Sequence, residues 1–246
     1  MLKKEIIVNR NKKELDIYKK YYSNNKGIIN RYERQINYYK DELCKKDLII
    51  QNNIDKVENL MIVAHPDDET LFGMNELYNK ENWLLIICTN SMDGRIGLIR
   101  KDIPGVIQMS KDYNFNLVVI QHFDMYEKIV NTRFDITVYN YLKEYLLKQK
   151  WRKIITHNKD GEYGHPQHIL VHQMVSNILF NNNVSYIEFK VFDFNDNVSN
   201  DITIVKNNIL KYYLCNPDQV NNFNCVKAYS RKTKPSNYDM TNLLCV

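Results

Sequence analysis

The chain has 246 residues, of which 44% are hydrophobic and 26% are charged, and its formal net charge is +5 at pH 7. This size and composition fit one α/β domain with a small extension, and no apolar stretch approaches the roughly 18 residues that a bilayer crossing needs. Because basic residues are interleaved with acidic ones and no apolar signal segment begins the chain, we expect neither a nucleic-acid partner nor secretion.

The cysteines point to a reducing compartment. They are odd in number and scattered, and no two are spaced as CxxC: Cys44, Cys88, Cys215, Cys225 and Cys245. A disulfide framework is therefore not expected, and a cytoplasmic or otherwise intracellular location is the prediction.

Residues 1–57 differ in composition from the rest of the chain. They are rich in lysine, asparagine and tyrosine, and an apolar stripe follows the 3–4–3–4 spacing of a helix face: Ile29, Tyr32, Ile36, Tyr39 and Leu43. The stripe lasts only about two heptads, which favours a short helix packed on the main domain over a coiled coil. The alternative is a helix that docks a partner or a second copy of the chain. We therefore predict an N-terminal helical extension, 1–57, and a separate domain, 58–246.

From residue 58 onward, short apolar runs alternate with helical stretches. The runs of strand length are 60–64, 83–89, 117–121 and 153–156, and the helical stretches are 69–79, 105–113, 136–149 and 166–180. Nearly continuous apolar strands alternating with helices predict an α/β fold with a mostly parallel sheet covered on both faces. Ligands of such sheets bind outside the carboxyl ends of the strands, so the loops after each run are where a site is expected.

These loops collect most of the polar residues that could do chemistry. The first contains His65, Asp67, Asp68 and Glu69; the second Asp93 and Arg95; the third His122 and Asp124; the fourth His157, Asp160, Glu162, Tyr163, His165 and His168. This clustering favours a functional site over surface decoration.

Metal binding is the most economical explanation of the cluster. One histidine and one or two carboxylates on a tight turn, joined by a histidine from another loop, supply the nitrogen and oxygen ligands that Zn²⁺ accepts. One carboxylate can ligate while the other takes a proton from water, whose pKa a metal lowers to about 7. A nearby histidine can then donate a proton or stabilise an oxyanion.

Structural explanations remain open for several of these residues. The acids of 67–69 could serve the N-terminus of the following helix, where an acidic side chain contributes about 0.3–1 kcal/mol. His122 and His172 fit structural or surface roles, and the single HxxxH spacing of His168 and His172 is weak evidence for a ligand pair. His157 fits either a structural role or support of a ligand.

Two motifs resemble those of a known family. "AHPDDE" closes the first strand and "YGHPQH" lies in the fourth loop, and together they resemble the LmbE-like/PIG-L family of zinc-dependent N-deacetylases over roughly 58–230. That family includes deacetylases of N-acetylglucosamine linked to inositol and of chitin oligosaccharides. The resemblance implies a Rossmann-like fold.

The resemblance also implies a role for individual residues. The zinc ligands would be His65, Asp68 and His168. Asp67 would be the general base, His165 would protonate the leaving amine or support the oxyanion, and Tyr163 would offer its phenol to the tetrahedral oxygen. Asp124 and Arg95 are looser matches to groups that contact substrate.

The chain departs from the family pattern at two places. The family usually has HPDH where this chain has Gln167, a change expected to alter hydrogen bonding around the ligands rather than ligation itself. An arginine and a glutamate that usually follow the second strand have no clean counterpart among Arg95, Arg100 and Asp102. The transmembrane helix of the eukaryotic members is absent, which makes a lipid-linked substrate a weaker expectation.

The sequence therefore predicts a metal-dependent hydrolase that removes acetyl from an N-acetylated amino sugar, either a small molecule or a glycan. Zn²⁺ is the expected metal, and Fe²⁺ would suit the same ligands. The alternatives are an amidase acting on a non-sugar or nucleotide-linked amide, a non-catalytic carbohydrate-binding relic, and a scaffold that assembles through its N-terminal helix.

Overall fold

A computed structural model describes residues 48–50, 57–78, 81–89, 91–92, 98–99, 103–120, 123–124, 134–194, 228–240 and 244–245. All of them belong to one compact unit, Lys46–Val246. Most of the predicted N-terminal helical extension lies outside the described residues. Its end does not: Leu48–Ile50 forms strand β1 of the main sheet, and the side chain of Val57 is buried in the core.

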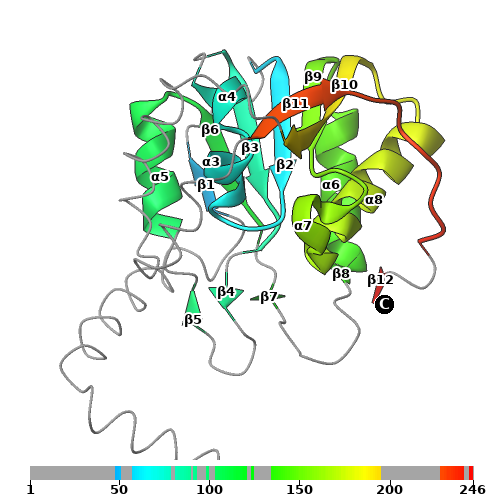
Figure 1. Ribbon diagram of the computed structural model, residues 1–246, viewed down its shortest axis with the longest axis horizontal. Coiled ribbons are helices and arrows are strands. Elements are labelled where there is room, and N and C mark those ends of the chain that lie inside the picture. The colour runs from blue at the N-terminus through cyan, green and yellow to red at the C-terminus, as the bar shows by residue number, and fades with distance from the viewer. Residues whose placement is uncertain are drawn as a thin grey trace, which may run out of the picture. The chain divides into compact units, whose positions relative to one another are not determined.

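The centre of the fold is a seven-stranded sheet in the order β1-β6-β3-β2-β9-β10-β11 (Figure 1). In chain order its strands are β1 (Leu48–Ile50), β2 (Asn59–Val63), β3 (Trp83–Ile87), β6 (Asn116–Val119), β9 (Trp151–Thr156), β10 (Tyr186–Phe194) and β11 (Ala228–Lys232). The strands β6, β3, β2, β9 and β10 run parallel, and β1 and β11 pair antiparallel at the two edges. The predicted mixed α/β fold with a mostly parallel sheet is confirmed.

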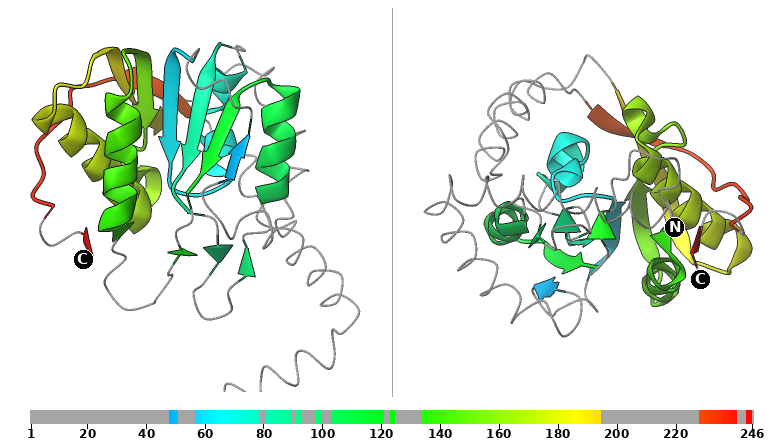
Figure 2. Two further views of the ribbon diagram at one scale, coloured as in Figure 1. Left: turned by 180° about the vertical axis from the view of Figure 1, so that it is seen from behind. Right: turned by 90° about the horizontal axis from the view of Figure 1, so that it is seen from below.

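Helices cover both faces of this sheet (Figures 1 and 2). They are α3 (Asp68–Leu71), α4 (Met74–Leu77), α5 (Ile103–Asp112), α6 (Ile136–Leu147), α7 (Gly161–Gly164) and α8 (Pro166–Asn181). The remaining short strands are β4 (Ser91–Met92), β5 (Leu98–Ile99) and β7 (Phe123–Asp124) in one small sheet, and β8 (Phe134–Asp135) with β12 (Leu244–Cys245) in another. Among the described residues, no helix is long and apolar enough to cross a membrane.

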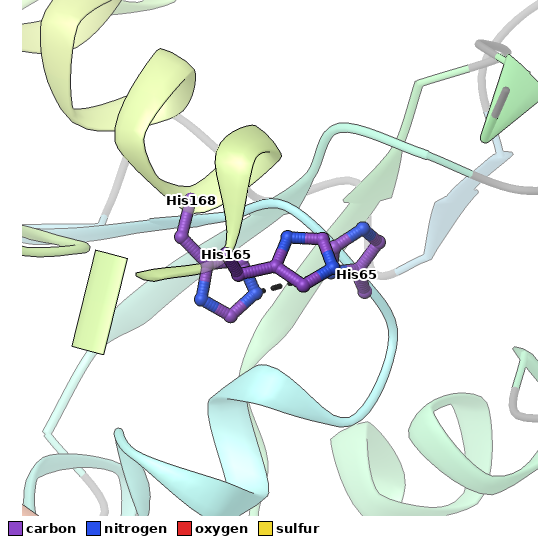
Figure 3. A group of neighbouring side chains, drawn as sticks. All are labelled: His65, His165 and His168. Carbon is purple, nitrogen blue, oxygen red and sulfur yellow. Dashed lines mark hydrogen bonds between the residues drawn. The ribbon is translucent and has the colours of Figure 1, made fainter. Parts of the chain in front are cut away.

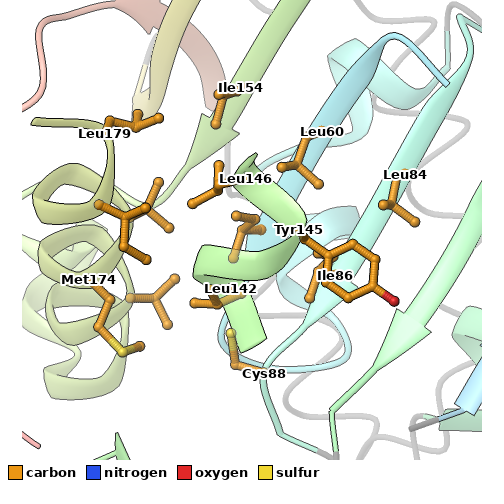
Figure 4. Packing of buried hydrophobic residues seen from close by; sticks show 14 of the residues in the cluster. Leu60, Leu84, Ile86, Cys88, Leu142, Tyr145, Leu146, Ile154, Met174 and Leu179 are labelled. Atoms are coloured by element: carbon orange, nitrogen blue, oxygen red, sulfur yellow. The ribbon is translucent and has the colours of Figure 1, made fainter. Parts of the chain in front are cut away.

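In the central strands β2 and β3 every residue is buried, and all but Asn59 are apolar. In β2, Leu60 and Ile62 join a core cluster with residues of α6 and α8, part of which Figure 4 shows, while Met61 and Val63 join a second cluster with residues of α3, α4 and α5. Successive side chains of a strand point to opposite faces, so an unbroken apolar run is what a doubly covered strand requires.

One predicted helix is divided in the structure. The stretch 69–79 forms two short helices, α3 and α4, with a break at Gly73. A Cβ atom at Gly73 would lie 2.6 Å from the sulfur of Met61, so a side chain here would require the flexible end of Met61 to move.

A charged network holds α4 against strands β9, β10 and β11. The Glu76 carboxylate accepts hydrogen bonds from Lys153 (3.3 Å), Lys190 (2.9 Å) and the Ser230 hydroxyl. Burial raises the pKa of Glu76, but the bonds from Ser230 and Lys190 outweigh it, so the pKa lies below its ordinary value and the group is ionised.

The direction in which strands are added to the sheet reverses between β2 and β9. From β2 the chain moves to β3 and β6 on one side, and then crosses to β9 and β10 on the other side of β2. Such a reversal of direction makes the loops after the two central strands diverge, and ligands of open α/β sheets bind there. Here β2 leads into the "HPDDE" loop, and β9 leads into the loop that contains "YGHPQH".

Candidate metal centre

The "HPDDE" loop folds back on itself directly after β2. The backbone N–H of His65 donates to Oδ2 of Asp68 at 2.7 Å, which turns the Asp68 carboxylate toward the start of the loop. Between them, Asp67 has a φ of 148°, a conformation that L residues rarely adopt and that costs of the order of 1–3 kcal/mol. Strain of this kind is concentrated at functional sites, and here it shapes the turn that carries two of the predicted ligands.

The helix-capping explanation of these acids does not hold for Asp67. It occupies the N-cap position of α3, but its side chain makes no capping hydrogen bond. Glu69 instead steadies the turn, because its Oε2 accepts the Asp67 N–H at 3.1 Å and its Oε1 accepts the Thr70 hydroxyl at 3.0 Å. Of the three acids, Glu69 is therefore the one with a clear structural role.

The three predicted ligands converge on one point. His65 Nδ1 lies 3.2 Å from His168 Nε2 and 3.3 Å from Asp68 Oδ2, and His168 Nε2 lies 3.3 Å from Asp68 Oδ1 (Figure 3 shows the two histidines). Zinc with four tetrahedral ligands at about 2.0–2.1 Å places neighbouring ligand atoms about 3.3 Å apart. The two nitrogens are thus spaced like neighbouring zinc ligands, and each lies at a similar distance from a different oxygen of the Asp68 carboxylate.

In His65 and His168, the hydrogen bond made by one ring nitrogen determines that the other ring nitrogen carries the lone pair. His168 Nδ1 lies 2.7 Å from Oε2 of Glu162, and a carboxylate only accepts, so Nδ1 carries the proton and Nε2 carries the lone pair. His65 Nε2 bonds to the amide oxygen of Gln167, which leaves the lone pair on Nδ1. Two nitrogen lone pairs and a carboxylate therefore face one another, and such an arrangement is repulsive unless a cation lies among them.

Asp68 supplies the negative charge of this group. Only 2% of it is exposed, and burial alone would raise the pKa of its carboxyl. When protonated, the nearby His168 and His65 rings outweigh burial and hold the pKa of this carboxyl well below its ordinary value. Asp68 is therefore an ionised, buried oxygen ligand, and the donor set of one carboxylate and two imidazoles fits a divalent metal.

His157 lies beside the same carboxylate but in a supporting position. Two groups of described side chains are placed to hold a metal ion, His65 with His165 and His168, and Asp68 with His157 and His168, so the predicted ligands are divided between them. Nε2 of His157 accepts the Ala64 backbone N–H at 3.0 Å, and its Nδ1 lies 2.9 Å from Oε2 of Glu162. Both ring nitrogens of His157 are thus already engaged by the Ala64 N–H and by Glu162.

The charge state of His157 follows from the same contacts. Burial lowers the pKa of the ring, whereas the Glu162 and Asp68 carboxylates raise it. The bond from Ala64 nevertheless requires a lone pair on Nε2, and a backbone N–H cannot reverse its direction. We therefore take the ring as neutral and protonated on Nδ1.

His165 lies against both ligand histidines. Its ring centroid is 4.7 Å from that of His65 and 4.4 Å from that of His168, and it is half-buried (Figure 3). Among the described residues its buried Nδ1 finds no hydrogen-bond partner. Burial, together with His65 and His168, lowers the pKa of the ring to about 3, so it is neutral at pH 7. An unpartnered buried nitrogen at this position fits a residue that bonds to a group held at the centre.

Tyr163 forms the open side of the site. Its ring lies 5.5 Å from His168 and 5.8 Å from His165 between centroids, and 62% of the residue is exposed. Phe72 contacts the same group from the inner side, with its ring 5.8 Å from His168. The site therefore has an apolar inner wall and an exposed phenol at its mouth.

Not every predicted site residue can be placed. Arg95 and His122 lie outside the described residues. Asp124 is the second residue of β7, where its backbone pairs with Met92 of β4, but its side chain is outside the described part. His172 has a structural role, because its Nδ1 bonds to the His157 carbonyl at 2.8 Å and its Nε2 lies 3.3 Å from the Tyr238 hydroxyl.

Sequence reasoning assigned no role to Glu162, which the structure places under two histidines. Its carboxylate accepts from Nδ1 of His157 (2.9 Å), Nδ1 of His168 (2.7 Å) and the backbone N–H of Asn158 (2.8 Å). Burial raises the pKa of Glu162, but His157 and the hydrogen bonds outweigh it and lower the pKa to about 2. A signal was present, since Glu162 is the acid closest in sequence to the "HPQH" ligand, between Gly161 and Gly164.

Comparison with known proteins gives few relatives. No protein-family model matches the chain. It is 30% identical over 133 residues to an uncharacterized protein of Acanthamoeba polyphaga mimivirus, a match that covers 50% of this chain and 58% of that protein. The chain thus spans less than two thirds of that relative's length. Among solved structures, the conserved protein TT1542 of Thermus thermophilus aligns with a TM-score of 0.48 at 12% identity, over 75% of this chain and 98% of that one.

Proposed function

We propose that the chain is a metal-dependent hydrolase that removes the acetyl group from an N-acetylated amino sugar, with the Rossmann-like fold of LmbE-like/PIG-L N-deacetylases. One observation carries the proposal: Nδ1 of His65 and Nε2 of His168 lie 3.2 Å apart, and each lies 3.3 Å from an oxygen of the Asp68 carboxylate, at the carboxyl ends of β2 and β9. Two further groups suited to amide hydrolysis, Asp67 and His165, come from the same two loops.

Zinc is the metal that this donor set fits best. Zn²⁺ accepts imidazole nitrogen and carboxylate oxygen in a tetrahedron, and three protein ligands leave one position open. Fe²⁺ suits two histidines and one carboxylate as well. The bound ion supplies a Lewis acid that polarises the acetamide carbonyl and lowers the pKa of water to about 7.

Asp67 is the proposed general base. Asp68 is engaged by the His65 N–H and by the ligand histidines, whereas the neighbouring Asp67 is half-buried and its side chain is not used to cap α3. It takes the proton from the attacking water as the oxygen–carbon bond forms. The same proton is then delivered to the amine nitrogen as the carbon–nitrogen bond breaks, so that acetate and the free amine leave.

His165 is the proposed support of the tetrahedral oxyanion. A ring whose pKa is about 3 carries no extra proton at neutral pH, which favours hydrogen-bond donation to the oxyanion over protonation of the leaving amine. Tyr163, at the mouth, offers its phenol to the same oxygen from the exposed side.

The test combines metal analysis with acetate release. We expect about one zinc or iron ion per purified chain, and release of acetate and free amine in equal amounts from at least one N-acetylated sugar in a panel of free, nucleotide-linked, lipid-linked and oligomeric substrates. A chelator should abolish the release, and added metal should restore it. Metal with no acetate from any sugar, but turnover of another amide, would favour the broader amidase. A purified protein that contains no metal and releases no acetate from any substrate would contradict the proposal.

A further inference from the structure

Glu162 is a buried acid that belongs to neither group able to hold a metal, yet it bonds to a histidine of each. Its Oε2 serves Nδ1 of His157 and Nδ1 of His168 together, at 2.9 and 2.7 Å. Its Oε1 accepts the backbone N–H of Asn158 at 2.8 Å. The carboxylate thus accepts three N–H groups. An ionised carboxylate has no proton to donate, so the imidazole nitrogen must be the donor in both histidine contacts.

One oxygen therefore sets the tautomer of two rings. With the proton held on Nδ1, His168 presents its Nε2 lone pair to Asp68 and His65, where the ligand atoms meet. With its own proton on Nδ1, His157 presents Nε2 to the Ala64 N–H at 3.0 Å, and this bond ties the first residue after β2 to the first residue after β9. The two rings lie nearly parallel, with centroids 3.9 Å apart, so neither can rotate without displacing the other.

The backbone at Glu162 is held in an unusual conformation. Its φ is 59°, a value that glycine adopts freely and glutamate rarely does, and Gly161 and Gly164 on either side have φ values of 65° and 90°. The Glu162 backbone N–H donates to the Asn158 side chain at 3.1 Å, and the same oxygen accepts the Asp160 N–H at 2.9 Å. This tight loop is what returns the carboxylate beneath both histidines.

We propose that Glu162 is a positioning residue for the metal centre: it fixes the Nδ1–H tautomer of His157 and His168 and so presents the Nε2 atom of His168 for ligation. The inference rests on the proposed metal centre and adds a residue to which nothing in the sequence gave a role. A carboxylate behind a ligand histidine orients the ring and raises its basicity, and loss of such a partner weakens metal affinity about 10–100-fold.

A purely structural role for Glu162 makes a different prediction. It would lower the thermal stability of a variant and leave the affinity of the folded protein for metal unchanged. Glu76 provides the matched control, since it is also a buried glutamate that accepts three hydrogen bonds, from Lys153, Lys190 and Ser230, but it has no bond to a histidine. The variants to compare are therefore Glu162→Gln and Glu76→Gln.

The first measurement is titration of chelator-stripped protein with Zn²⁺ and with Co²⁺, whose absorption spectrum reports the ligand field. We expect Glu162→Gln to bind each metal about 10–100-fold more weakly than wild type. Its amide must turn an NH₂ toward one of three N–H donors, so at least one bond is lost. Glu76→Gln should bind as wild type does. A Glu162→Gln protein that binds within twofold of wild type would overturn the inference.

Glu162→Gly is a second variant that keeps the test available if Glu162→Gln does not fold. Glycine suits the backbone at this position, so this variant should keep the fold while it lacks the carboxylate. We expect the same loss of affinity, partly restored by added formate, a small carboxylate. A Glu162→Gly protein that binds metal as tightly as wild type in the absence of formate would also overturn the inference.

Nitrogen-15 NMR of the imidazoles in metal-free wild type tests the tautomers without any variant. The neutral forms of His157 and His168 are expected to carry the proton on Nδ1, and a neutral His168 ring with its proton on Nε2 would overturn the inference even if metal binds. A wild type that binds neither metal but shows both Nδ1–H tautomers would contradict the proposed function while it supports the role of Glu162. The two failures are therefore distinguishable.

Discussion

Oδ1 of Asp68 lies 3.3 Å from Nε2 of His168, although the two residues follow different strands of the sheet. Asp68 begins α3 after β2, and His168 lies in the first turn of α8 after β9. The strands are adjacent and parallel, so their carboxyl ends bring the two loops together at one edge. The parallel pairing of β2 and β9 therefore brings two of the proposed metal ligands into contact.

Asp67→Asn should separate catalysis from metal binding. The amide cannot accept the proton of water, so we expect the rate of acetate release to fall by about 10²–10⁴-fold while metal content stays at the wild-type level. Asp68→Asn is the matched neighbour and should lose the metal, because it removes the only anionic ligand. Metal content and acetate release of the two variants check this, and wild-type turnover by Asp67→Asn would remove Asp67 from its role.

Gln167 should influence the metal through His65. Its amide oxygen bonds to Nε2 of His65 and so leaves Nδ1 free to ligate. Gln167→Ala removes that acceptor and should weaken zinc affinity about tenfold, whereas Gln167→Asp, which offers a charged acceptor, should bind at least as tightly as wild type. Zinc titration of the stripped proteins measures both, and equal affinities for wild type and Gln167→Ala would exclude the effect.

Tyr163→Phe should affect the reaction and not the metal. The phenol is exposed at the mouth of the site, and its ring lies 5.5 Å from that of His168, so loss of the hydroxyl removes a donor and leaves the ligands in place. We expect kcat for acetate release to fall about 10–100-fold, less than the roughly 10²–10³-fold typical of a buried oxyanion donor, with unchanged metal content. An unchanged kcat would show that the tyrosine contributes only to the surface.

Glu76 should make stability depend on pH in a defined direction. Its pKa is lowered from 4.5 by Ser230 and the lysines, so it binds protons less readily in the folded chain than in the unfolded chain. Its contribution is therefore fully present above about pH 4.5 and is lost as the pH falls through the lower folded value. Glu76→Gln should lower the free energy of unfolding by about 2 kcal/mol at pH 7, and this difference should shrink below pH 4.5. Urea denaturation at several pH values measures it, and a difference that grows in acid would contradict the assignment.

The strands that sequence could predict are those buried on both faces. In β2 and β3 every residue is apolar or buried, so the apolar run itself marks the strand. Strand β10 is different, because Ile187 is 64% exposed and Lys190 is only half-buried, so polar and apolar residues alternate. Strand β1 was missed for another reason: Leu48–Ile50 is three residues long and adjoins a segment with helical spacing. Edge strands depend on pairing partners that a local pattern does not contain.

The site shows a similar division. The residues that sequence reasoning named as ligands, His65, Asp68 and His168, are brought together by the structure, because they follow the adjacent parallel strands β2 and β9. Glu162 could not be given its role in the same way. Its carboxylate reaches two histidines only because its backbone adopts a φ of 59°, and residue type and spacing do not specify that conformation.

The most direct test of the metal centre is an anomalous diffraction map of crystals grown with zinc, recorded at the zinc absorption edge. We expect one strong peak about 2.0–2.2 Å from Nδ1 of His65, Nε2 of His168 and a carboxylate oxygen of Asp68, with Asp67 and His165 facing the open position. No peak at this position, or a peak ligated by His157 in place of His65, would contradict the account.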